Sequence, residues 1–152
     1  LSCTDAVAHW CTDSNRAIIQ VMGSFREALP PEYWLPALPP FLDCEGIALR
    51  QRCPAQSMAL LFNAASNSGA YGTAPYGAIG RLNAWNTLRT LLQCPPKLPI
   101  ESVAQHLRQA NWWEFNTDTW FYNDWLDLGL AATWVNNQGR IQFGILAATD
   151  TD

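Results

Sequence analysis

The chain has 152 residues and a formal net charge of −4, and 49% of its residues are hydrophobic while only 14% are charged. This length fits one domain, residues 1–152, with a substantial core, and the composition argues against a disordered chain. The scarcity of Lys and Arg argues against nucleic acid as a partner, because phosphate contacts need clustered basic residues. The apolar runs fall well short of the roughly 20 residues that span a bilayer, so we expect no membrane partner.

Five cysteines are present and none forms a CxxC pair, which suggests small buried side chains in a reducing, cytoplasmic compartment. Cys3, His9 and Cys11 are close in sequence, but a fourth metal ligand would have to come from far away, so we expect no cofactor. The chain begins with Leu1, which leaves open whether the N-terminus is complete or processed.

The first part of the chain is expected to be helical. Thr4 could cap a first helix, and Asp13 or Ser14 a second one in which apolar residues recur at helical spacing up to Pro30. A further helix is expected over residues 44–52. Others follow at Pro54, at 76–93 and at 99–110, with a small-residue loop at 67–75.

After Asn111 the apolar period changes from helical to alternating. Residues 127–135 and 140–147 each alternate, and Asn136-Asn137-Gln138-Gly139 between them is turn chemistry, so an antiparallel hairpin is expected. Residues 112–115 and 120–122 are candidate additional strands. The predicted fold class is therefore α+β, with a helical N-terminal two thirds (1–110) packed on a C-terminal antiparallel sheet or hairpin (111–152).

An acidic and aromatic window lies within the β-rich part. Five of the chain's eight tryptophans fall there, and no Lys or Arg lies between Arg108 and Arg140. If the aromatic residues are not core, this window is the expected binding surface, with tryptophan rings as anchors and carboxylates as ligands or acid/base groups. The candidate binding residues are Trp112, Trp113, Glu114, Asp118, Trp120, Asp124, Trp125 and Asp127.

The tail carries a second candidate site. Asp150 and Asp152 are two residues apart beyond a strand and would point to one side if the strand continued, so they are candidate metal ligands. The alternative is an exposed terminus whose acids serve solubility.

Four segments carry a resemblance: GRLNAW at 80–85, WFY at 120–122, WLDLGLA at 125–131 and LAATDTD at 146–152. They resemble a family of uncharacterised bacterial proteins with no assigned activity. The resemblance covers roughly the C-terminal half and implies only that the Trp- and Asp-rich segment and the acidic tail form one feature.

Three functions remain open from the sequence. The first is a non-enzymatic protein-interaction module, immunity-like or accessory, that binds a basic partner through the acidic, tryptophan-rich surface or forms a homodimer. The second is a metal- or carboxylate-dependent hydrolase that uses the acidic cluster. The third is a small-ligand or carbohydrate-binding protein with an aromatic pocket closed by residues 69–75. The absence of catalytic motifs favours the first.

Overall fold

The computed structural model describes residues 7–13, 16–25, 35, 46–66, 77–117 and 128–150. These residues build one six-stranded sheet in the order β1-β2-β6-β5-β4-β3, in which every neighbouring pair is antiparallel. The strands are β1 (Val7–Asp13), β2 (Arg16–Phe25), β3 (Ile47–Arg52), β4 (Asn111–Thr117), β5 (Leu128–Val135) and β6 (Ile141–Asp150). The longest, β2 and β6, pair along their full lengths near the middle of the sheet.

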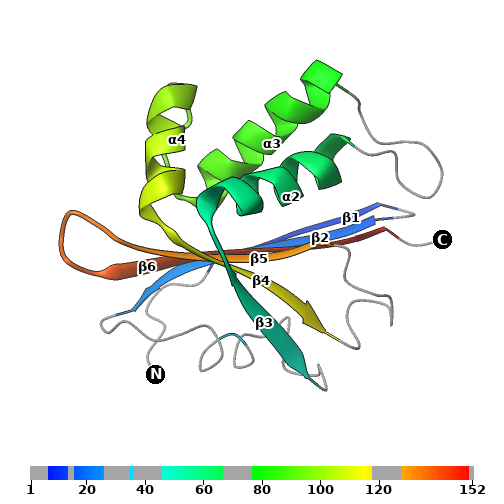
Figure 1. Ribbon diagram of the computed structural model, residues 1–152, viewed down its shortest axis with the longest axis horizontal. Helices are drawn as coiled ribbons and strands as arrows, with labels where there is room; N and C mark the ends of the chain where they lie inside the picture. Colours follow the sequence, from blue (N-terminus) through cyan, green and yellow to red (C-terminus); the bar gives the residue numbers. More distant parts are fainter. Residues whose placement is uncertain are drawn as a thin grey trace.

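Three helices, α2 (Pro54–Ser66), α3 (Gly77–Leu91) and α4 (Ile100–Gln109), follow β3 and precede β4 in the chain. Figure 1 shows them together on one side of the sheet. Pro54 opens α2 at a position where its missing N–H costs nothing, and the Gln56 side chain accepts a hydrogen bond from the Cys53 backbone N–H at 3.0 Å. These two features fix the start of α2 directly after β3.

The main core lies between the helices and the sheet. It joins Met58 and Leu61 of α2 to buried residues of α3, α4 and the sheet, among them Trp112, Leu130 and Leu146. Phe143 and Ile145 of β6 are also fully buried but lie outside this cluster, as expected for strand residues that face the opposite side of the sheet. The central strands are therefore buried on both faces.

The end of α3 packs directly on β6 at Gly144. A Cβ at this position would overlap the carbonyl oxygen of Leu91, so only glycine lets the helix approach the strand this closely.

The predicted C-terminal hairpin is confirmed. Strands β5 and β6 pair in one continuous register from Leu128 with Ala148 to Val135 with Ile141. The Asn136 side chain accepts hydrogen bonds from the backbone N–H groups of Gln138 and Arg140, and Gly139 adopts a φ of 74°. Residues 136–139 thus form the tight turn that the sequence predicts between the two strands.

The prediction of a helical N-terminal two thirds is wrong. Residues 7–13 and 16–25 form the antiparallel strands β1 and β2, and residues 47–52 form β3 where a helix was expected. Helices and strands are therefore mixed along the chain, and the sheet contains strands from both its beginning and its end. The predicted helices after Pro54, at 76–93 and at 99–110 correspond to α2, α3 and α4.

None of the helices within the described residues has the length and apolar character needed to cross a membrane.

Candidate functional site

Within the described residues the sheet ends at β3, and this margin carries Arg50, Arg52 and Glu114. β4 pairs with β3 so that Glu114 is opposite Arg50, and Asn116 is opposite Ala48. Because cross-strand partners share a face of the sheet, these residues lie on the same face as the buried Trp112, toward the helices. The strand register therefore brings the carboxylate of Glu114, the amide of Asn116 and the guanidinium group of Arg50 onto one face of the sheet.

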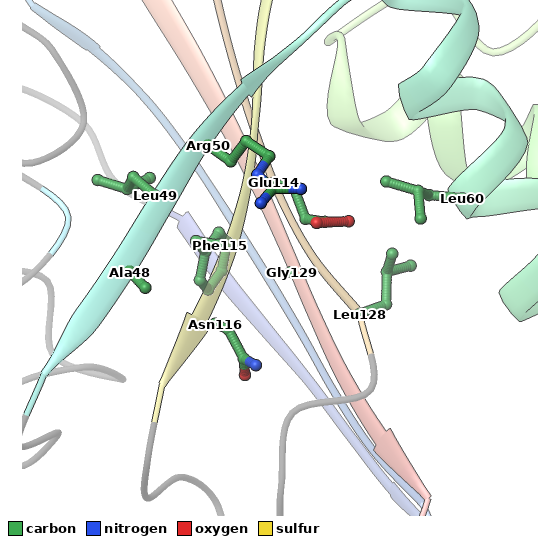
Figure 2. A pocket seen from close by; sticks show the side chains of 9 residues that line it. All are labelled: Ala48, Leu49, Arg50, Leu60, Glu114, Phe115, Asn116, Leu128 and Gly129. Carbon is green, nitrogen blue, oxygen red and sulfur yellow. The ribbon is translucent and has the colours of Figure 1, made fainter.

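A pocket of about 490 Å³ lies between this face and α2. Figure 2 shows Leu60 reaching from α2 toward the strands, with Arg50 beside Glu114, and Asn116 and Leu128 further along. Strands β3, β4 and β5 form the floor, and Leu60 and Leu128 supply apolar walls. A pocket with an apolar wall and a few fixed polar groups is typical of a binding site.

The charges in the pocket are arranged by one ion pair. Arg52 Nη2 lies 3.1 Å from Glu114 Oε1, and the two side chains are 22% and 31% exposed. An ion pair this accessible to water contributes only about 0–1 kcal/mol to stability, so its main effect is to orient the carboxylate. Arg50 is exposed and forms no ion pair with any other described residue.

Two buried polar atoms lie where β3 meets α2, Arg52 Nε at the end of the strand and Ser57 Oγ in the first turns of the helix. Within the described part of the chain, neither Arg52 Nε nor Ser57 Oγ makes a hydrogen bond. A second hollow of about 420 Å³ runs along the other side of Leu60 and is lined by Arg52, Gln56 and Asn63. Leu60 lines both hollows, and Arg52 lines only the second one.

The structure divides the predicted acidic and aromatic window. Trp112 is only 1% exposed, and its Nε1–H donates a hydrogen bond of 2.9 Å to the carbonyl oxygen of Leu107, so it belongs to the core. Trp113 is half-buried on the opposite face of β4, and Glu114 lines the pocket. Outside the described residues lie Asp118, Trp120, Asp124, Trp125 and Asp127.

The tail pair is described only in part. Asp150 is the last residue of β6 and is in register with Arg16 of β2, while Asp152 lies outside the described residues. Among the residues that the structure describes, no three His, Cys, Asp or Glu side chains come together to hold a metal ion. A metal site at Asp150 and Asp152 stays a prediction.

Sequence reasoning missed Arg50, Arg52 and Asn116 as site residues. In the structure, residues 47–50 alternate between half-buried and exposed positions. Ile47 and Leu49 alternate with Ala48 and Arg50, which is the period of a strand, but the segment was interpreted as helical.

The predicted resemblance to a family without assigned activity is confirmed and extends beyond the C-terminal half. No curated protein and no solved structure matches the chain. The matching family model covers residues 1–152, and the chain therefore belongs to the family of unknown function DUF6183.

Proposed function

We propose that this domain is a non-enzymatic protein-interaction module, of an immunity-like or accessory kind, that binds a partner protein at the margin formed by β3, β4 and α2. One observation carries the proposal. The strand β3 is the last in the sheet order, and the charged pocket lies directly beside it. The backbone groups of β3 that are unpaired within the described sheet and the charged side chains of the pocket therefore lie side by side, where one partner could contact both.

The edge strand supports binding through the backbone. No other described strand pairs with the outer side of β3, so its outward N–H and C=O groups can pair with an extended segment of another chain. In this mode of recognition the main-chain hydrogen bonds supply affinity, and adjacent pockets that accept alternate side chains supply specificity. The pocket beneath α2 is placed to accept such a side chain.

The charges support a partner of mixed charge. Arg50 suits a carboxylate of the partner, because it has no ion pair within the described residues. The acidic residues from Glu114 to Asp127 and the net charge of −4 favour a partner that is basic overall.

The test uses a charge reversal at the pocket. Affinity capture from the native host supplies the partner, and calorimetry with the purified partner then measures the dissociation constant for the wild type, Arg50→Glu and Arg108→Glu. Arg108 is an exposed arginine on α4, away from the pocket, and serves as the matched control. We expect Arg50→Glu to weaken binding about tenfold or more and Arg108→Glu to change it less than about threefold. Equal effects of the two variants would place the interface elsewhere.

A second copy of the chain is the alternative partner. Light scattering over a range of concentrations shows whether the protein forms a homodimer, and Arg50→Glu shows whether the dimer uses this margin. If Arg50→Glu dimerised with the same dissociation constant as the wild type, the dimer interface would not be the proposed surface.

A cytoplasmic location belongs to this proposal. The described cysteines Cys53 and Cys94 are free thiols, and free thiols are typical of proteins in a reducing compartment.

A further inference from the structure

A third pocket, of about 370 Å³, shares no lining residue with either hollow beside Leu60. It is enclosed by the loop after α3, by α4 and by the turn between β5 and β6. Twelve residues line it, and none of them is Asp, Glu, Lys or Arg. Half of the lining residues are carboxamides, namely Gln93, Gln109, Asn111, Asn136, Asn137 and Gln142. With no carboxylate, ammonium or guanidinium group and with His106 as its one imidazole, the lining suits a neutral ligand that is rich in hydrogen-bonding groups.

A chain of hydrogen bonds fixes one wall of the pocket. The half-buried Trp134 donates through Nε1 to Gln142 Oε1 at 3.0 Å, and Gln142 Nε2 donates to Gln93 Oε1 at 3.2 Å. Gln93 Nε2 in turn donates to the carbonyl oxygen of Phe143 at 3.2 Å. The indole and both amides are therefore held in defined orientations before any ligand arrives.

The backbone at Gln93 indicates that its side chain is needed. Gln93 has a φ of 56°, and it is the one non-glycine residue with positive φ among those the structure describes. The N–H of Cys94 bonds to the carbonyl of Arg89, and the N–H of Gln93 bonds to that of Thr90, which is the helix ending that usually has glycine at this position. A side chain here costs about 1 kcal/mol relative to glycine. Strain of this kind is commonly retained where a side chain serves a function.

Three further carboxamides in the lining are open to solvent. Gln109, Asn111 and Asn137 are exposed, and their side chains make no hydrogen bond to any described residue. Each carboxamide offers a donor and an acceptor side by side, which matches a hydroxyl group that both donates and accepts.

The Cys94 thiol in this pocket is not activated as a nucleophile. Burial raises the pKa of the Cys94 thiol, and the opposing effect of Arg89 is smaller, so the thiol stays protonated at neutral pH. The pocket offers binding groups without an activated nucleophile.

We propose that this pocket binds a neutral saccharide, whose ring packs on Trp134 while its hydroxyl groups bond to the free amides of Gln109, Asn111 and Asn137. The fixed amides of Gln93 and Gln142 complete the polar wall. The proposed interaction surface at β3 is a separate site and does not depend on this pocket.

The test is a titration monitored by ¹H–¹⁵N NMR. Glucose, galactose, mannose and N-acetylglucosamine are added separately, and the Trp134 indole resonance is assigned by its disappearance in Trp134→Phe. We expect at least one sugar to shift the Trp134 indole and the Gln93 and Asn111 signals in a saturable manner. The double variant Gln109→Ala/Asn111→Ala should weaken this binding about tenfold or more, because both amides are lost.

The control variant is Gln105→Ala. Gln105 is an exposed glutamine on α4 that does not line the pocket, so this variant should bind the sugar like the wild type. The two changed side chains of the double variant make no hydrogen bonds within the described residues, so its dispersed spectrum should persist. The proposal is overturned if no sugar gives saturable shifts. It is equally overturned if the double variant binds like the wild type, or if only a neutral peptide such as N-acetyl-dialanine amide binds.

Discussion

Trp112 is fully buried, and its indole N–H is bonded to the last turn of α4 through the carbonyl oxygen of Leu107. Trp112→Phe removes this hydrogen bond and leaves a buried carbonyl without its donor. We expect the free energy of unfolding to fall by about 2 kcal/mol, measured by urea denaturation.

The neighbouring residue gives the matched control. Trp113 is half-buried on the other face of β4. Trp113→Phe should therefore lower the free energy of unfolding by less than about 1 kcal/mol. A larger loss for Trp113→Phe than for Trp112→Phe would contradict the assignment of Trp112 to the core.

At this scale the sequence named candidate residues, but which of them share a pocket depends on the fold. Glu114 was identified and lines the pocket beneath α2. Trp112 was also proposed for binding, because adjacent tryptophans of a strand look alike in sequence although they point to opposite faces. Arg50 and Arg52 could not be placed beside Glu114, since their pairing depends on a strand register that joins residues more than sixty positions apart.

Among the elements, the packing of α3 on β6 depends on one glycine. Gly144→Ala would force the Leu91 carbonyl oxygen away from the strand. We expect this variant to lose about 2–3 kcal/mol of unfolding free energy, a typical cost of overpacking, measured by thermal or urea denaturation.

Gly46→Ala provides the comparison, because no atom of a described residue lies within 4 Å of a Cβ at that position. It should change stability by no more than about 0.5 kcal/mol. Comparable losses in the two variants would show that α3 does not pack on β6 as closely as the structure indicates.

The elements that the sequence predicted correctly are those with strong local signals. The helix after Pro54 has a defined start, and the hairpin has alternating strands joined by turn residues. At the N-terminus the signals were ambiguous. Asp13 and Ser14 suit a helix cap and also a tight turn, and in the structure Asp13 pairs with Arg16 across a two-residue connection. The β-branched Ile18, Ile19 and Val21 favour a strand, but apolar residues at successive positions of β2, which has a strand on each side, hide the alternation.

For the molecule as a whole, strand order predicts an uneven distribution of local stability. β6 lies between β2 and β5, whereas β3 has a neighbour on one side only within the described sheet. Hydrogen–deuterium exchange should therefore be slowest in β6 and at least about tenfold faster in β3, which can open locally.

This measurement also bears on the proposed interaction. If the backbone amides of β3 exchanged as slowly as those of β6, the outer edge of β3 would already be covered and could not accept a partner strand. A binding partner that pairs with this edge should slow exchange in β3 and leave β6 unchanged.

The pairing of β2 with β6 also determines when the sheet can be completed during synthesis. Phe25 is in register with Ile141, more than one hundred residues later in the chain. At ordinary rates of translation, β2 emerges from the ribosome on the order of ten seconds before β6 does. During this interval the β1–β2 hairpin has its Ile- and Val-rich strand unpaired on one edge, so the nascent chain exposes a surface that chaperones recognise.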